Sequence, residues 1–386
     1  MPEFLKQLRF SKEINLIFFS IFLFAAAFGI NMVTFPSILS KNGIDAANIG
    51  IAFSVDIFGG ILMSFFLSKF VARFGIFKSL KICAFAYSAA ILIIYFYQSF
   101  LLWIAFAFLM GSIWFAYVIT RQSWLNILTG NKNRSVVLGC FSLVISSGLA
   151  VGPVIVSFSG AESYLSFVIS AAITLASFFC LGSLKKSAQP QIESNRISLK
   201  EFFKTNPRCF LGRLFLDFQT YLLMTMTVVF GKKIGLSPEA SGILISAYLA
   251  SCFADLLAGF ILKKVSAYKM INIGFLGCLS CFLIIIFFHD SYSLLLFLYF
   301  FFGVFIAMIF VSVFKITNED YPEEKLIAAN STFQLIGAIG SILGSSIGGF
   351  LIVVFGAVGF PITMALSSIF YLTFLVIYEK KYSPRS

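Results

Sequence analysis

Three of the sixteen acidic residues, Asp56, Asp217 and Asp255, stand deep inside long apolar runs of the chain. A charged side chain at the centre of a bilayer costs roughly 2.5–3.5 kcal/mol on insertion scales, so each of these needs a partner, a wet cavity or a proton. A buried carboxyl group whose surroundings alternate between apolar and hydrated can take up a proton in one state and release it in the other. We therefore treat the three aspartates as candidate proton carriers.

The composition removes most other kinds of chemistry. The 386 residues are 60% hydrophobic and only 11% charged, whereas a soluble domain carries roughly 25% charged residues. A single histidine, His289, leaves no His-based triad or metal cluster. Cys278 and Cys281 have metal-site spacing, but they lie in an apolar run, so we interpret them as packing residues. No phosphate-binding Walker loop occurs. We expect no metal, no cofactor and no enzymatic activity.

The apolar runs recur along the whole chain, each near the roughly 20 residues that a helix needs to cross a bilayer. They predict twelve membrane-spanning helices in two sets of six. The first set is 14–36, 48–68, 79–97, 100–120, 135–158 and 164–184, and the second is 209–230, 240–262, 270–288, 292–314, 326–355 and 358–378.

The net charge of +12 is explained by the positions of the basic residues. With the N-terminus inside, all but three of the 28 Lys and Arg residues flank the cytoplasmic ends of the predicted spans. The exceptions are Lys41, Lys232 and Lys233. Such an excess orients membrane proteins with their basic segments in the cytoplasm. The pattern predicts that both termini are cytoplasmic and gives no reason to expect nucleic-acid binding. The composition favours the inner membrane of a bacterium.

The predicted organisation has five parts. A cytoplasmic N-terminus (1–13) precedes a six-helix bundle (14–184), a cytoplasmic linker (185–207), a second six-helix bundle (208–378) and a cytoplasmic tail (379–386). Within the linker, Leu199, Phe202 and Phe203 share one helical face, which predicts a short helix on the inner membrane surface. A flexible tether remains an equal alternative.

The two halves carry an internal repeat at an offset of 192 residues. Gly43-Ile44-Asp45 followed by Gly50 matches Gly235-Leu236-Ser237 followed by Gly242, each just before an even-numbered span. Two six-helix halves in parallel orientation predict a substrate site between them, near the middle of the membrane.

Two further patterns carry a resemblance. In the fifth run, Gly139, Gly148 and Gly152-Pro153 have the spacing G-x8-G-x3-G-P, and Arg73, Gly75 and Lys78 follow the second run as Lys264 follows the eighth. With these motifs the whole chain resembles the major facilitator superfamily (MFS), whose proton-driven exporters carry the fifth-helix signature. The alternative for the glycines is a seam of close helix packing. Ala72 and Ala107 replace the acid and the arginine of two family motifs, so the chain matches the fold more closely than the multidrug subgroup.

The resemblance also assigns roles to the aspartates. It places Asp217 on the seventh helix, which lines the central cavity, so Asp217 is the first candidate for proton coupling. Alternatively, Arg213 lies one helical turn earlier and holds Asp217 as a structural ion pair. Asp56 is placed at the outer rim, where it binds substrate or gates with Asn31, or else bonds to a neighbouring helix. For Asp255 we favour a structural pair with a basic residue, for which the candidates are Lys263, Lys264 and Arg134.

Other polar and aromatic residues in the spans are candidates for lining the substrate cavity. They are Asn31, Trp114, Tyr117, Arg121, Gln219, Tyr221, Tyr248 and Gln334. Arg121 ends the fourth span, where it either draws an anionic substrate from the cytoplasm or anchors the helix at the interface. With 51 phenylalanines in the chain, most aromatic residues must serve packing or face lipid.

These observations predict an all-α membrane protein with twelve helices in two pseudo-repeat halves. The resemblance implies a monomeric secondary transporter that moves a small molecule by alternating access, with protons or another ion as the coupling ion. We expect proton-coupled export of a drug, a metabolite or a siderophore-like solute. Two alternatives remain: a proton-coupled importer of a nutrient or siderophore, and a membrane sensor that binds its ligand without transporting it.

Overall fold

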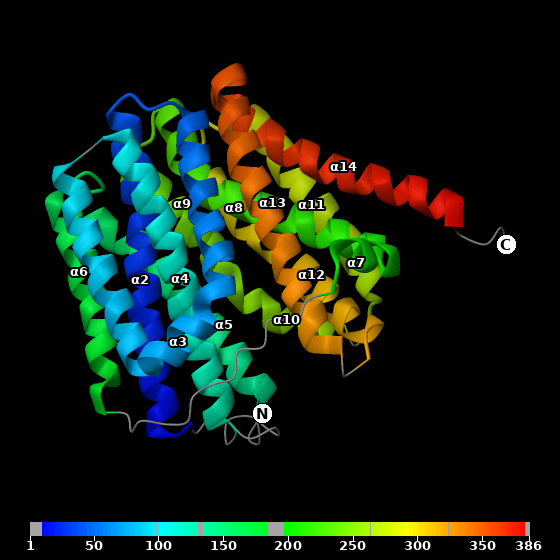
Figure 1. The fold of residues 1–386 in the computed structure, drawn as a ribbon. Helices are drawn as coiled ribbons and strands as arrows, with labels where there is room; N and C mark the ends of the chain where they lie inside the picture. Colours follow the sequence, from blue (N-terminus) through cyan, green and yellow to red (C-terminus); the bar gives the residue numbers. More distant parts are fainter. Residues whose placement is uncertain are drawn as a thin grey trace. The chain divides into compact units, whose positions relative to one another are not determined.

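The computed structural model describes residues 10–97, 99–129, 134–183, 197–262, 264–322 and 325–382, and within these ranges it contains helices and no strands. The chain forms two compact units. The first consists of Met1–Ile38 and Val55–Glu193, and the second of Leu39–Ser54 and Ser194–Ser386. Helices are labelled as in Figure 1.

The first unit is built from long helices joined by short connections (Figure 1). They are α2 (Lys12–Lys41), α3 (Ala46–Phe96), α4 (Phe100–Leu128), α5 (Arg134–Ser159) and α6 (Tyr164–Phe179), with a 3₁₀ turn at Cys180–Ser183. The end of α2 and the first turns of α3 belong to the second unit.

The second unit holds the remaining helices. They are α7 (Leu199–Thr205), α8 (Pro207–Lys233), α9 (Pro238–Ala250), α10 (Ala254–Ile261), α11 (Ala267–Phe288), α12 (Tyr292–Asp320), α13 (Leu326–Phe355) and α14 (Gly359–Tyr382), with 3₁₀ turns at Ser251–Phe253 and Gly356–Val358. Here α8 packs along α13, and α11 packs against both α12 and α14.

Nine helical stretches of the described residues are long and apolar enough to cross a membrane. Two of them, Ala46–Phe96 and Ala328–Tyr378, are 51 residues long, more than twice the length that one crossing needs. Each of these stretches covers two of the predicted spans to within two residues. A further apolar helix, Tyr164–Phe179, is shorter. The all-helical membrane architecture is confirmed, and the count of twelve crossings stays a prediction.

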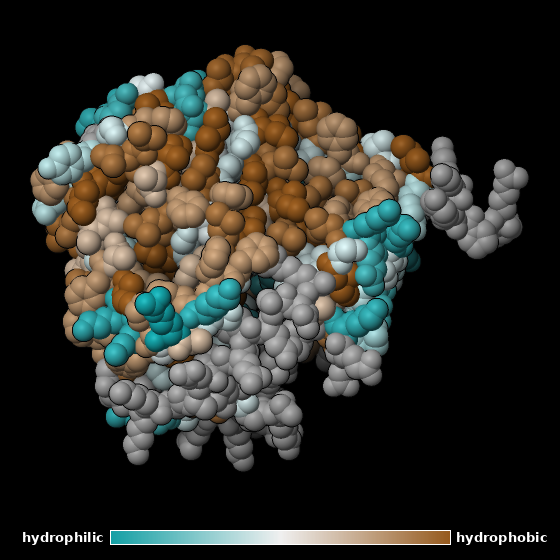
Figure 2. Space-filling view, viewed as in Figure 1, coloured by the Kyte–Doolittle hydropathy of each residue, from teal (hydrophilic) through white to brown (hydrophobic). Residues whose placement is uncertain are grey.

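The exterior of the helices is apolar. Figure 2 shows hydrophobic side chains along the helices and hydrophilic ones gathered near helix ends. Phe158 is 87% exposed and Phe287 is 74% exposed, in addition to many other large apolar side chains. Monomeric soluble proteins rarely expose contiguous apolar patches of this extent. Lipid is the solvent that fits such a surface.

The repeat seen in the sequence is also a repeat of local structure. Gly43 and Gly235 follow the ends of α2 and α8 with φ of 77° and 82°. The residue after each glycine donates its N–H to a carbonyl five residues earlier, that of Leu39 (3.0 Å) or Gly231 (2.9 Å). Both helices therefore end in a Schellman motif, which requires the left-handed conformation that glycine adopts without strain.

The same offset recurs at the starts of later helices. The first residues of α9, α12 and α13 lie 192 positions after those of α3, α4 and α5. Ser99 and Ser291 cap α4 and α12 through their hydroxyl groups, and Asp45 and Ser237 accept from the backbone N–H three residues later. Because these caps satisfy otherwise unpaired N–H groups, the helix starts are fixed by local chemistry in both halves.

The predicted break between the second and third spans lies at Gly75, the one residue inside α3 with non-helical backbone angles (φ 75°, ψ 159°). Gly75 is therefore the kink at which one helix ends and the next begins, and Arg73 and Lys78 of the loop signature lie on either side of it. Their counterpart Lys264 lies in the turn after α10, where its N–H donates to the carbonyl of Ile261.

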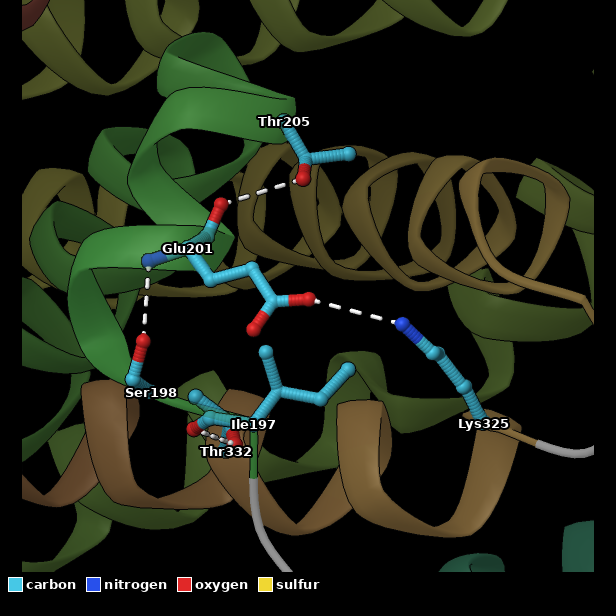
Figure 3. A network of polar contacts seen from close by, with 6 residues as sticks. All are labelled: Ile197, Ser198, Glu201, Thr205, Lys325 and Thr332. Carbon is cyan, nitrogen blue, oxygen red and sulfur yellow. Dashed lines mark hydrogen bonds and ion pairs between the residues drawn. The ribbon is translucent and has the colours of Figure 1, made fainter.

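The described part of the linker forms the short helix α7, which docks on the second unit (Figure 3). Ser198 caps it, Thr332 of α13 donates to the carbonyl of Ile197 at 2.7 Å, and Glu201 lies 3.6 Å from Lys325. Phe202 is 1% exposed. The predicted helix is therefore present, and part of its apolar face is buried in protein. Residues 184–196, most of the predicted linker, lie outside the described ranges.

The fifth-helix glycines form a seam between α5 and α2. A Cβ atom on Gly148 would collide with the Phe22 carbonyl and Ala25, and one on Gly152 would collide with the backbone of Gly29. Pro153 lies inside α5. A Cβ on Gly139, by contrast, would meet nothing within 4 Å. Small residues allow this close approach of helices, so two of the three signature glycines serve packing.

We expect Gly152→Val to destabilise the protein by about 1–3 kcal/mol, the usual cost of forcing extra methyl groups into a close-packed site. Gly139→Ala is the matched control, and it should leave stability unchanged or raise it slightly, because alanine favours helix more than glycine does. Thermal unfolding of the purified, detergent-solubilised variants measures both. Equal midpoints for the two variants would contradict the seam.

Candidate functional site

An ion pair on α8 is the centre of the polar cluster in the second unit. Nε of Arg213 lies 2.7 Å from Oδ2 of Asp217, one helical turn away, and their side chains are 8% and 17% exposed. We call Arg213 and Asp217 the α8 ion pair. Opposite charges at this spacing on one helix attract each other, and burial in a membrane-spanning segment makes each the main neutralising group of the other.

The arginine of this pair also contacts two neighbouring helices. Its Nη2 donates to Oε1 of Gln334 on α13 at 3.2 Å. Its guanidinium lies over the ring of Phe333, 4.4 Å from the centroid, and near the ring of Phe310 on α12 at 5.6 Å. Gln334 itself is exposed. The predicted candidates Asp217 and Gln334 are thus brought together through Arg213, which holds three helices at one point.

A row of glycines on α13 makes this arrangement possible. Gly340, Gly344 and Gly348 lie against successive turns of α8, where an added Cβ would collide with Leu214, Phe218 or Leu222. Gly337 continues the row, and a Cβ there would collide with Oδ2 of Asp217 and with the Arg213 guanidinium. The missing side chain of Gly337 therefore leaves the space that the α8 ion pair occupies.

Two other candidates of this unit are Tyr248 and Asp255. The Tyr248 hydroxyl interacts electrostatically with Asp217 and Asp255, and its ring packs against Phe302, 5.7 Å between centroids. Asp255 lies in the first turn of α10, and no cation among the described residues lies within 4.0 Å of it. The pairing proposed for it stays a prediction, because Lys263 and the side chain of Arg134 lie outside the described parts.

Gln219 and Tyr221 have different surroundings. The Gln219 amide is fully buried, and its Nε2 lies 2.7 Å from the hydroxyls of both Ser367 and Ser368 on α14. It links two helices. Tyr221 is partly buried, and its carbonyl accepts from Thr225. The role of Gln219 and Tyr221 as cavity residues stays a prediction.

We expect Gly337→Ala to disrupt the α8 ion pair, since the new methyl group occupies the position of the Asp217 carboxylate. A buried pair that is forced apart leaves two uncompensated charges, which typically costs several kcal/mol. The thermal unfolding midpoint should fall, whereas Gly259→Ala should leave it unchanged because nothing lies within 4 Å of an added Cβ there. A Gly337→Ala midpoint equal to that of the wild type would show that the pair does not need this space.

In the first unit, Asn31 of α2 is the centre of a buried hydrogen-bonded cluster. Its Nδ2 donates to the Tyr87 hydroxyl at 2.9 Å, and its Oδ1 accepts from Ser170 of α6 at 3.2 Å. Asp56 is 7% exposed and interacts electrostatically with the same tyrosine. Asn31 therefore contacts Tyr87 directly, whereas Asp56 is linked to this tyrosine only through their electrostatic interaction.

Trp114 and Tyr117 belong to an aromatic column formed by α2 and α4. The Tyr117 ring lies 3.9 Å from that of Phe24, and the Trp114 ring lies 5.6 Å from Phe24 and 4.2 Å from Phe28, centroid to centroid. Trp114 is half-buried, whereas Phe24 and Tyr117 are fully buried. The column joins two of the predicted cavity residues into one packed surface.

Arg121 stands at the end of this column and is fully buried. Its guanidinium stacks on the Tyr117 ring, 3.4 Å from the centroid. Nη2 donates to the Ser20 hydroxyl at 2.6 Å and contacts the Ser177 carbonyl at 3.5 Å, while Nη1 contacts the Tyr117 carbonyl at 3.4 Å. All of these acceptors are neutral. The position differs from that of an interfacial anchor, whose charge would lie in water.

Comparison with known proteins identifies the family. The sequence profile of the Major Facilitator Superfamily matches residues 17–211 and 209–386, which together cover almost the whole chain. The chain belongs to the Major Facilitator Superfamily. It is therefore a multi-pass membrane transporter of the secondary type and not an enzyme.

Several MFS proteins are similar to it. The uncharacterized MFS-type transporter YfkF of Bacillus subtilis (strain 168) is 23% identical over 274 residues, which are 69% of this chain and 70% of YfkF. Among solved structures, a mutant form of the nucleoside transporter NupG superposes with a TM-score of 0.81 at 14% identity, covering 96% of this chain and 100% of NupG. A bacterial homolog of the human lysosomal transporter Spinster, in an inward-facing and unoccupied conformation, gives a TM-score of 0.73 at 15% identity, over 95% and 96% of the two chains. These structural likenesses show the MFS fold.

Proposed function

We propose that this MFS transporter couples solute movement to protons at the α8 ion pair. The observation that carries the proposal is the Arg213–Asp217 contact of 2.7 Å, buried in a span and enclosed by Phe333 and Gly337. In such surroundings the charge state of one partner decides whether the other is neutralised. A proton on Asp217 therefore changes the energy of the whole cluster.

The proposed cycle has two states of this pair. With Asp217 ionised, Arg213 is neutralised and the three-helix contact at Gln334 and Phe333 is held. When Asp217 takes a proton, Arg213 becomes a buried cation without a counterion, which favours a rearrangement that hydrates it. Gln334 is exposed, and an amide in a membrane span is more stable facing water than lipid. Gln334 therefore marks a hydrated side of the ion pair, from which protons reach Asp217. Binding a proton then biases the two conformations of an alternating-access transporter.

We expect Asp217→Asn to abolish gradient-driven transport while preserving exchange of substrate across liposome membranes. Asparagine keeps the shape of the side chain but carries no titrating proton, so the cycle loses its coupling and keeps its binding site. Driven uptake under an imposed pH gradient, compared with counterflow without a gradient, separates the two activities.

Asp255→Asn and Asp56→Asn are the matched controls, since both are acids inside spans of the same chain. Driven transport that survives Asp217→Asn but is lost in one of these variants would move the coupling role to that residue. Loss of both driven transport and exchange in Asp217→Asn alone would mean that the α8 ion pair is structural.

The direction we propose is export of a small solute, on the basis of the fifth-helix signature Gly139–Pro153. Import of a nutrient or a siderophore is the second candidate. It is kept because Gly148 and Gly152 are taken up by the seam with α2, so the signature that suggests export is also explained by packing alone. We also propose that the protein lies in a bacterial inner membrane as a monomer, with both termini in the cytoplasm.

Small-molecule profiles of cells and medium decide the direction. For an exporter, one compound builds up inside a strain that lacks the protein and appears in the medium when the protein is overproduced. For an importer, the compound stays unused in the medium of the deletion strain. A purified protein that binds this compound but shows no counterflow in liposomes would be a sensor.

A further inference from the structure

We infer that Arg121 binds the anionic group of the transported solute, a carboxylate or a phosphate. This inference rests on the proposed function as a transporter of small solutes and names the chemical class of its cargo. It starts from the electrostatics of the first unit, in which Arg121 is fully buried. An ionisable group inside a membrane-spanning bundle needs a partner of opposite charge, water or a functional ligand.

No acid fills that need among the described residues. The described acids of the first unit are Glu13, Asp56 and Glu162, and none of them lies within 4.0 Å of Arg121. The contrast with the second unit is direct, because Arg213 is neutralised by Asp217 at 2.7 Å. Within the described parts of the chain, one buried arginine therefore has an internal counterion, and the other has only neutral oxygens.

The surroundings of Arg121 do not depend on it for their own hydrogen bonds. Ser20 donates to the Ser177 carbonyl, and the Tyr117 hydroxyl bonds with the Ser177 hydroxyl at 2.7 Å. The Tyr117 carbonyl lies in the middle of α4, where the helix itself supplies a donor. Removing the guanidinium would thus leave none of these buried polar groups without a partner. Among the described residues, Arg121 adds a charge without an acidic partner to a network that is complete without it.

The geometry suits an oxyanion. A guanidinium has five N–H groups in a rigid fork that matches carboxylate and phosphate oxygens. Two of the contacts of Arg121, to Tyr117 and Ser177, are long at 3.4 and 3.5 Å, so an anion can replace them at little cost. The stack on Tyr117 fixes the plane of the fork.

The neighbours of Arg121 indicate the rest of the ligand. The aromatic column continues from Tyr117 through Phe24 and Trp114 to Phe28, and its half-buried member Trp114 is the accessible one. Aromatic side chains favour flat apolar groups through stacking contacts. The cargo class is therefore an organic anion with an aromatic or apolar body, held by its charge at Arg121.

The first test compares two arginine-to-methionine variants of the full chain in lipid nanodiscs, without added ligand. Arg121→Met should unfold at the wild-type temperature or higher, because it removes a buried charge and leaves no orphaned partner. Arg213→Met is the matched control and should unfold at a lower temperature, because it leaves Asp217 as a lone buried carboxylate. A drop for Arg121→Met as large as that for Arg213→Met would make Arg121 structural and overturn the inference.

The second test uses benzoate, phenyl phosphate and the neutral benzamide as probes of binding. Benzoate or phenyl phosphate should raise the unfolding temperature of the wild type, and which of the two acts more strongly distinguishes a carboxylate site from a phosphate site. Neither should protect Arg121→Met, and Arg121→Lys should retain part of the effect. Equal protection by benzamide, protection of Arg121→Met, or protection by none of the probes overturns the inference.

Failure of this inference is distinguishable from failure of the proposed function. Gradient-driven transport of a neutral or cationic compound, unchanged in Arg121→Met, would refute the anion site and leave proton-coupled transport standing. Absence of counterflow for a compound that binds would refute transport itself.

Discussion

A charge in the apolar interior of a membrane protein must be neutralised, hydrated or protonated, and the internal organisation of this transporter follows from that constraint. The second unit meets it within one helix, since Arg213 and Asp217 lie one turn apart and neutralise each other. In the described part of the first unit, the charge of Arg121 is surrounded only by neutral oxygens and the ring of Tyr117. Both arginines are buried in apolar spans, but among the described residues only Arg213 has an acidic partner. This difference is the basis for proposing a proton site at Arg213–Asp217 and an anion site at Arg121.

Close helix packing determines where these charges can lie. Lipid provides no hydrophobic force that drives helices together, so contact depends on small residues that let backbones approach. Gly340, Gly344 and Gly348 of α13 lie against successive turns of α8, and Gly337 at the end of this row leaves room for the ion pair. In the first unit, Gly148 and Gly152 bring α5 against α2 in the same way. The glycine signature that is associated with transport direction therefore also serves helix packing. The close contacts between α5 and α2 support this packing role directly.

The sequence was sufficient for features that depend on local chemistry. Apolar runs located the helices, and the repeat at Gly43 and Gly235 is a repeated helix ending. The spacing of Arg213 and Asp217 on one helix indicated their pair as one of two alternatives. It was insufficient where contacts depend on the rotation of one helix against another. The polar clusters are completed by Tyr87, Ser20, Ser177 and Gly337. The sequence did not indicate these residues, because apolar spans carry no periodic pattern that shows which face turns inward. A glycine row at three- and four-residue spacing, such as Gly337 to Gly348, does mark in the sequence a helix face that packs closely against a neighbour.

The two proposed sites together link cargo charge, direction and energy source. Export of a monovalent anion in exchange for one proton moves two charges with the membrane potential, since the anion leaves a negative interior while the proton enters it. At about 2.3 kcal/mol per charge per 100 mV, that exchange gains about 4.6 kcal/mol from each 100 mV. Import of the same anion together with one proton moves no net charge and draws only on the pH gradient. With an anion at Arg121 and a proton at Asp217, export is therefore the direction that a membrane potential drives strongly. Import with the same two sites depends on the pH gradient and not on the membrane potential. The electrostatics of two side chains in this way connects the direction of transport to a measurable electrical property.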